Sequence, residues 1–159
     1  MKIINKEKLI NAFFAAIGGF MCIGLLSYLN MSIDGSIWLI PPFGASMVLV
    51  MAVHESPLAQ PKNLLFGHVL SALSGVLIYI LLGQSFYSLG AGVALAIFAM
   101  MITDTIHPPA GANPIIVILG GKSFSFIFLP VAVGALIIII FAIIYNKILG
   151  RNYPKSRIN

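Results

Sequence analysis

Charged side chains are scarce in this chain of 159 residues: they make up 8% of it, whereas 60% of the residues are hydrophobic. Soluble domains carry charge at about a quarter of their positions. The mean hydropathy is +1.06. Acidic residues are the rarest charged type, with Glu7, Asp34, Glu55 and Asp104 as the full set. This composition excludes an ordinary soluble domain and predicts an integral membrane protein.

Cysteine occurs once, as Cys22 inside an apolar run. A single cysteine excludes an intrachain disulfide and a cysteine-based metal site. The chain also lacks a nucleophile motif, a phosphate-binding loop and a dinucleotide fingerprint. We therefore expect no cofactor, no metal and no enzymatic activity. The alternatives are a metal site from His54, Glu55, Asp104 and His107, or a membrane-embedded enzyme that uses Asp104 and His107.

The basic residues gather at the two ends of the chain. Seven of the nine lie in residues 1–8 or 147–159: Lys2, Lys6, Lys8, Lys147, Arg151, Lys155 and Arg157. The positive-inside rule then predicts a multi-pass protein of the cell membrane, with both tails cytoplasmic and an even number of crossings. The net charge of +5 reflects this topology and favours anionic lipid. We expect no nucleic-acid partner.

The apolar runs predict an all-α protein with a single transmembrane domain over residues 1–159. Residues 9–29, 64–82, 89–103 and 124–145 form the longer runs, and residues 41–53 and 115–119 form shorter ones. A crossing needs about 20 residues to span about 30 Å. As a helix, residues 41–53 cover only roughly 20 Å. Residues 146–159 are polar, and we expect them to be mobile.

Two runs of helix breakers interrupt the apolar sequence. Residues 41–46 read PPFGAS and residues 108–113 read PPAGAN, an offset of 67 with four of six positions identical. We interpret residues 9–83 and 84–150 as two repeats of a span, a Pro-Pro-broken short helix and a span. Six crossings with inverted halves are the preferred topology. The alternative is four spans with two re-entrant segments.

Paired, broken helices at matching places in two halves point to a transporter binding site. The first amides of a helix lack partners and suit an anion. Gly44 and Gly111 would allow a close approach of the backbone, and Ser46 and Asn113 would add polar contacts. The alternative is that both motifs are helix-packing corners. The predicted substrate-binding residues are Pro42, Gly44, Ala45, Ser46, His107, Pro109, Gly111, Ala112 and Asn113.

Four ionisable residues are candidates for proton coupling or gating. Asp104 and His107 lie three residues apart, so they would be neighbours on one helix face. His68 lies inside a span, where an ionisable group is a functional candidate by default. His54 is expected at an interface. The alternatives are a helix-end hydrogen bond in which Asp104 or Thr105 helps the chain turn, a backbone contact for His68 and a solvated turn for His54.

The sequence resembles the HPP family of small integral membrane proteins. The resemblance rests on the His-Pro-Pro triplet at residues 107–109, on residues 41–46, on Gln60 to Asn63 leading to Gly67-His68, and on residues 103–114. Members of the family are described as having four spans, and some are associated with nitrite transport. The resemblance thus implies nitrite as the substrate.

We therefore predict a transporter or channel for a small inorganic anion, with its path at the Pro-Pro breaks and with nitrite as the leading substrate that the resemblance implies. Its partners would be the anion, the lipid bilayer and further copies of the chain, because many Gly and Ala residues permit tight contacts between copies. The alternative function is a non-transporting membrane anchor or assembly subunit. A transporter should show a polar path lined by both breaks, whereas an assembly subunit should pack them dry.

Overall fold

The computed structural model describes residues 5–155, and within that range it contains helices and no strand. Three helices are long and apolar enough to cross a membrane. They are α1 (Lys6–Ser32), α3 (Pro61–Leu82) and the helix formed by η3 (Ile127–Ala132) with α6 (Val133–Ile148). The prediction of an all-α membrane protein is confirmed.

Three further apolar helices are shorter. They are α2 (Pro41–Ala52), α4 (Phe86–Ile102) and the pair η2 (Pro108–Ala112) and α5 (Asn113–Leu119). The single turn η1 (Pro57–Ala59) precedes α3. Both predicted breaks are therefore places where a short helix begins with two prolines, since proline has the backbone angle of a first turn and needs no donor there.

The second break differs from the first, because η2 is a 3₁₀ helix that changes to α-helix only at Asn113. In a continuous α-helix the amide of residue 114 would bond to the carbonyl of Ala110. Residue 114 is proline and has no amide hydrogen. The hydroxyl of Ser71 on α3 donates to the Ala110 carbonyl instead. This contact fixes the second break against α3.

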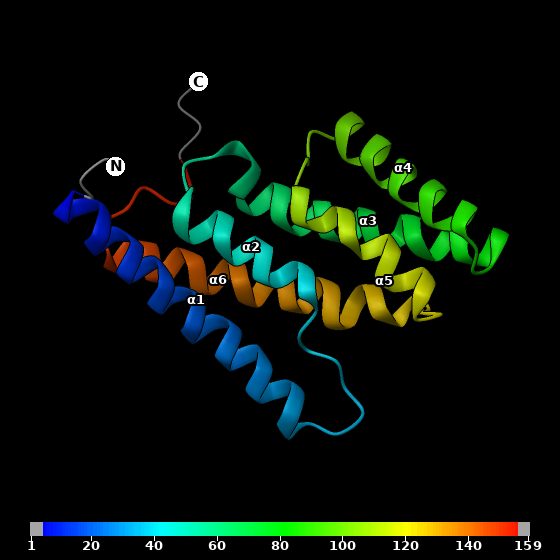
Figure 1. Cartoon of the computed structure of the whole chain (residues 1–159), viewed down its shortest axis with the longest axis horizontal. Coiled ribbons are helices and arrows are strands. Elements are labelled where there is room, and N and C mark those ends of the chain that lie inside the picture. Colours follow the sequence, from blue (N-terminus) through cyan, green and yellow to red (C-terminus); the bar gives the residue numbers. More distant parts are fainter. Residues whose placement is uncertain (1–4, 156–159) are drawn as a thin grey trace.

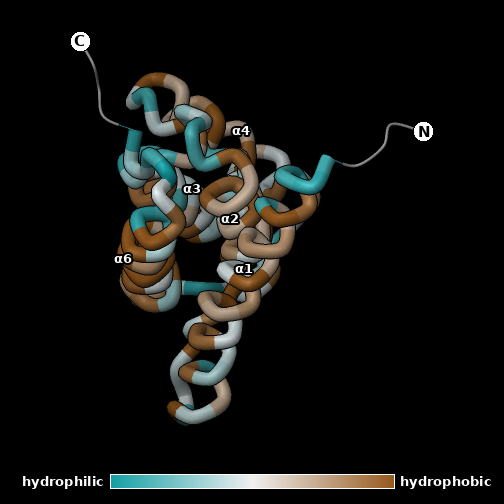
Figure 2. Tube along the Cα trace, turned by 90° about the vertical axis from the view of Figure 1, so that its left-hand side faces the viewer, coloured by the Kyte–Doolittle hydropathy of each residue, from teal (hydrophilic) through white to brown (hydrophobic). Residues whose placement is uncertain are grey.

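Helix α3 lies in the middle of the molecule and packs against α4, α5, α6, η2 and η3. Successive helices run in opposite directions along the long axis, and the start of α1 lies at the same end as the end of α6 (Figure 1). Helix α1 packs against α2 and α6. Only 17% of its apolar window is buried, and its trace is largely hydrophobic (Figure 2). Such a surface suits contact with hydrocarbon or with another protein.

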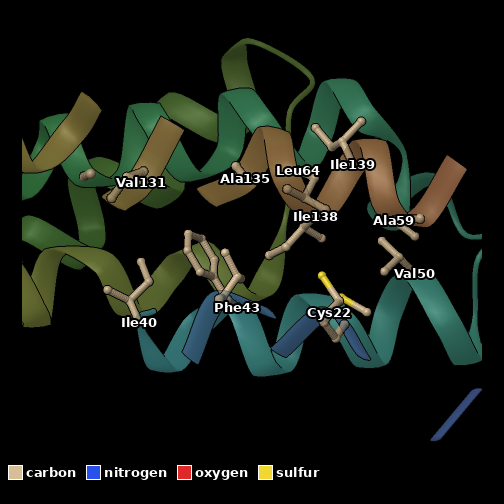
Figure 3. Packing of buried hydrophobic residues seen from close by; sticks show 14 of the residues in the cluster. Cys22, Ile40, Phe43, Val50, Ala59, Leu64, Val131, Ala135, Ile138 and Ile139 are labelled. Atoms are coloured by element: carbon tan, nitrogen blue, oxygen red, sulfur yellow. The ribbon is translucent and has the colours of Figure 1, made fainter. Parts of the chain in front are cut away.

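The hydrophobic core lies between α2, α3 and α6, as the labelled side chains in Figure 3 show. Phe43 of α2 is fully buried there. Its ring lies against Gly134 of α6, where an added Cβ atom would overlap two of the ring carbons. Glycine at this position thus lets α2 and α6 approach closely enough to bury the ring.

The segment after α6 is bound to the rest of the protein. Arg151 donates through Nη1 to the carbonyl of Met51 at 3.0 Å, and Tyr153 Oη donates to the carbonyl of Ala59 at 2.9 Å. The amide of Lys155 donates to Gln60 Oε1 at 2.9 Å. The expectation of a mobile tail is thus wrong for residues 146–155. Residues 1–4 and 156–159 of the predicted tails lie outside the described residues.

Candidate functional site

Four polar side chains meet in the interior where the two broken helices approach α3. They are Ser46 on α2, His68 on α3, His107 just before η2 and Asn113 at the start of α5, and we call them the polar cluster. Each has no exposed surface. Since burying polar groups costs free energy unless they are hydrogen-bonded, their mutual bonds decide whether this arrangement is stable.

Ser46 is the centre of the polar cluster. Its Oγ lies 2.9 Å from Nε2 of His68 and 2.8 Å from Nε2 of His107. Nδ1 of His107 lies 2.8 Å from the carbonyl oxygen of Leu58 in η1. Nδ2 of Asn113 lies 3.0 Å from both Nδ1 and the carbonyl oxygen of His68. Every ring nitrogen therefore has a partner at hydrogen-bonding distance.

The partners determine which nitrogen of each ring carries the hydrogen. The carbonyl of Leu58 can only accept, so Nδ1 of His107 carries a hydrogen and its Nε2 accepts. The side chain of Asn113 faces a carbonyl, so it presents its NH₂ group, and Nδ1 of His68 accepts. Nε2 of His68 then carries the hydrogen. With both rings neutral, Ser46 accepts from His68 and donates to His107.

One polar atom of the cluster has no partner among the described residues. Oδ1 of Asn113 is buried and accepts no hydrogen bond. Buried polar atoms in folded proteins are nearly always paired. This oxygen is therefore a free acceptor next to His68, and it suits a donor such as water or a protonated ligand better than a bare anion.

The first turns of the broken helices offer fewer free amides than predicted. Pro41, Pro42, Pro108 and Pro109 have no N–H group. The next amides are used: that of Phe43 donates to the Ile40 carbonyl at 3.0 Å, and that of Ala110 donates to the His107 carbonyl at 3.0 Å. Side chains of the polar cluster, rather than helix amides, are the polar groups that the two breaks bring together.

The predicted substrate-binding residues divide into an inner and an outer set. Ser46, His107 and Asn113 belong to the polar cluster, and the carbonyl oxygen of Pro42 lies 3.1 Å from Ser46 Oγ. The remaining residues lie outward: Gly44 and Ala45 are exposed, and Pro109, Gly111 and Ala112 are half-buried.

Neither Gly44 nor Gly111 packs closely against another part of the chain. A Cβ atom added to either one meets nothing within 4 Å. Gly44 lines an apolar groove of about 630 Å³ between α1 and α2, together with Gly19, Phe20 and Ile23. The packing-corner interpretation is therefore wrong for both glycines. Their predicted role, which is to let the backbone approach the substrate, stays a prediction.

The predicted pairing of Asp104 with His107 on one helix face is wrong. Helix α4 ends at Ile102, and Asp104 is exposed with a φ of 52°. His107 is buried in an extended conformation. The chain leaves the helical path at Asp104, whose backbone has this positive φ, and Thr103 Oγ1 donates to the Ala99 carbonyl at the helix end. A spacing of three residues brings side chains together only while the helix continues.

His54 lies outside the polar cluster, in the turn after α2, and is half-buried. Burial, and then the positive charge of Arg151, hold its pKa below the usual range, against an opposing effect of Glu55. Within residues 5–155 no three His, Cys, Asp or Glu side chains are grouped as metal ligands. His54, Glu55, Asp104 and His107 thus do not assemble.

Sequence reasoning missed two residues that position the cluster. Gly67 leaves room for His107, because an added Cβ atom would lie 2.7 Å from the His107 Cβ and 2.9 Å from the Thr105 carbonyl oxygen. The carbonyl of Leu58 fixes the His107 ring. Gly67 could have been found from its place directly before His68, whereas a backbone carbonyl leaves no signal in the sequence.

Comparison with known proteins shows that nearly the whole chain matches one protein family. The model of the HPP transmembrane region matches residues 4–154. Two transmembrane proteins of Dictyostelium discoideum are each 37% identical, over 145 and 150 residues. The matches cover 86% and 88% of this chain but 47% and 52% of the relatives, so the chain spans about half their length. No solved structure matches.

Proposed function

The chain belongs to the HPP transmembrane family, and we propose that it transports a small inorganic anion across a membrane, with nitrite as the leading substrate. The observation that carries this proposal is the polar cluster, which joins one polar side chain from each Pro-Pro-broken helix to His68. Buried ionisable and polar groups at membrane depth are costly, and in membrane proteins they mark substrate or proton pathways. The contact between the two breaks is polar, as expected for a transporter, and it is closed, because each side chain of the cluster is fully buried.

We further propose that the six helices α1–α6 cross the membrane as two inverted repeats, with both termini in the cytoplasm. Shifted by 67 residues, the bounds of α2 fall on Pro108 and Leu119, which are the bounds of η2 and α5 taken together. With three helices in each half, the halves take opposite orientations. Ser46 and Asn113 then occupy the same repeat position and flank His68 from its two sides, as related groups do in transporters with inverted repeats.

An anion must compete for donors that the closed cluster already uses. The hydroxyl of Ser46, Nε2–H of His68 and the amide of Asn113 all donate within the cluster. Binding therefore requires that one of these donors turns to the anion, or that a proton adds a new donor. Proton-linked transport, or entry of the protonated acid, follows from this arrangement more directly than passage of a bare anion.

The test is a flux assay with the purified protein in liposomes, comparing nitrite, nitrate, formate and chloride, each with and without a pH gradient. We expect nitrite uptake that increases when the outside is more acidic. Asn113→Ala should remove most of it, because His68 loses its donor. Asn11→Ala, at an exposed position on α1, is the matched control. If none of the four anions moves, transport is wrong and the assembly-subunit function is favoured.

The groove between α1 and α2 supports the expected association of copies. It is apolar and about 630 Å³ in volume, and it lies beside a helix that has few contacts within the chain. A second copy of the chain, or lipid, would cover it. Native mass spectrometry in a lipid-like detergent would separate these occupants, since protein copies give integer multiples of 17.0 kDa.

A further inference from the structure

We propose that Ser46, His68 and His107 form a binding site for one proton, in which the Ser46 hydroxyl turns from His107 to the carbonyl of Pro42 when the proton arrives. As a coupling step this rests on the transport function proposed above. The proton site itself is a property of the protein without substrate, and it is tested in that state.

In the neutral state the hydroxyl of Ser46 has two acceptors within reach. Nε2 of His107 is 2.8 Å away, and the carbonyl oxygen of Pro42 is 3.1 Å away. One hydroxyl hydrogen serves one of them at a time. If it served Pro42, Nε2 of the neutral His107 would be left with a lone pair facing a lone pair of Oγ. The neutral cluster therefore keeps the hydroxyl on His107.

An added proton changes this choice and leaves no group unpaired. The proton binds the lone pair of His107 Nε2, which then donates to Ser46 Oγ. The hydroxyl hydrogen turns to the Pro42 carbonyl, one turn earlier on α2. Oγ now accepts from both rings and donates once, which is the full capacity of a hydroxyl. The bond O–H···N is replaced by N⁺–H···O, and no heavy atom has to move.

The surrounding groups limit the site to one proton. A second proton would have to bind Nδ1 of His68, which faces the NH₂ group of Asn113 at 3.0 Å. That amide cannot turn its oxygen inward, because it also donates to the His68 carbonyl. The two rings lie 5.0 Å apart, so two positive charges would also repel. One ring at a time can be charged.

The groups at the two ends of the hydrogen-bond chain allow the site to hold a proton but not to relay it further. At one end the Leu58 carbonyl only accepts, and at the other end the Asn113 amide only donates to the His68 ring. Neither group passes a proton on under ordinary conditions. The proton must leave by the side on which it entered, or be transferred to a ligand that reaches the cluster. Its release to a ligand therefore requires that the ligand binds at the cluster.

The charged groups around the cluster do not supply a counter-ion. Helices α2 and α5 and the turns η1 and η2 carry no ionisable side chain. On α3, Lys62 Nζ bonds to the Thr103 carbonyl at 3.2 Å. Asp104 is exposed, and Tyr153 donates to Ala59 in η1. The charge of the bound proton is therefore unbalanced within the described residues, so an anion beside His107 would stabilise it and be stabilised by it.

The direct test is nitrogen NMR of the full chain with ¹⁵N-labelled histidine rings in lipid bilayers, without any anion substrate, from pH 8 to pH 4. We expect opposite tautomers at high pH, with the hydrogen on Nδ1 of His107 and on Nε2 of His68. On acidification the His107 ring should become charged and the His68 ring should stay neutral. Identical tautomers, a charged His68 ring, two charged rings, or no charged ring by pH 4 would each overturn the proposal. His54 serves as the internal reference.

Two variants test the part that Ser46 plays. Ser46→Ala removes the acceptor for the charged ring, and we expect the proton affinity of the site to fall by at least roughly tenfold. Ser74→Ala is the matched control, because that hydroxyl bonds only within α3, to the Leu70 carbonyl. Unchanged proton uptake in Ser46→Ala would overturn the proposal. If this variant does not fold, the tautomers of His68 and His107 in the wild-type protein test the proton site. If these tautomers are as expected but nitrite is not transported, the transport function is wrong and the proton site stands.

Discussion

Gly67 on α3 lies directly against His107, so that a Cβ atom added to the glycine would lie 2.7 Å from the Cβ atom of the histidine. The neighbouring carbonyl of Thr105 would be 2.9 Å away. Neither atom is the far end of a flexible side chain that could turn aside. Glycine at position 67 is therefore a condition for the position of His107, and through it for the contact of His107 with Ser46.

Gly67→Ala should displace the segment of His107 from α3 and weaken the polar cluster. We expect the free energy of unfolding to fall by about 1–3 kcal/mol, the usual cost of overpacking, and flux to fall with it. Denaturation in mild detergent measures the first effect. Gly44→Ala is the control, because its Cβ would meet nothing within 4 Å. Equal stability of the two variants would contradict the packing argument.

Asn113→Ala should release His68 from its fixed tautomer. The variant removes the donor to Nδ1 and to the carbonyl of His68, and loss of such buried bonds costs about 1–3 kcal/mol. The ring spectrum of His68 should then show both tautomers, while His107, held by the Leu58 carbonyl, keeps its own. Asn11→Ala should leave both rings unchanged. A single unchanged tautomer at His68 would mean that Asn113 does not set it.

Tyr153→Phe tests the segment that follows α6. The hydroxyl of Tyr153 is buried and donates to the carbonyl of Ala59 in η1. Its loss leaves that carbonyl without this donor, so we expect stability to fall by about 0.5–1.5 kcal/mol. The exposed Tyr28 provides the control Tyr28→Phe, which should change nothing. Since η1 also holds His107 through Leu58, the tautomer of His107 is the second readout.

Arg151→Gln should raise the pKa of His54 part of the way to its usual value, since burial, the larger cause of the lowered pKa, remains. Chemical shifts of the His54 ring measure this. Lys147→Gln removes a charge from the last turn of α6 and should leave the titration unchanged. An equal shift in both variants would mean that the net charge of the protein, and not the charge of Arg151 in particular, acts on His54.

The same pKa shift gives stability a dependence on pH. Because the pKa of His54 is lower in the folded protein, the unfolded chain binds more protons in the window just below pH 6.5. Stability should therefore fall as the pH falls through that window. His54→Gln should remove this component, which denaturation at several pH values would show. A steeper fall in the variant would contradict the sign.

The sequence by itself determined the class of protein, the helical structure and the places where helices restart. Apolar runs of sufficient length specify spans because the bilayer leaves no other option for the backbone. Pro41 and Pro108 specify helix starts because a missing amide is tolerated there and not in a helix interior. These are local rules, and α2 and η2 begin at those two prolines.

Only the tertiary structure decided which side chains meet. Ser46 and His107 are 61 residues apart, yet they share a hydrogen bond of 2.8 Å. Asp104, three residues from His107, is directed away because α4 ends at Ile102. Contacts of this kind depend on how α2, α3 and η2 pack, on the space left by Gly67 and on a carbonyl at Leu58. The sequence contains two similar Pro-Pro breaks 67 residues apart, and the fold showed that side chains, not helix amides, connect them.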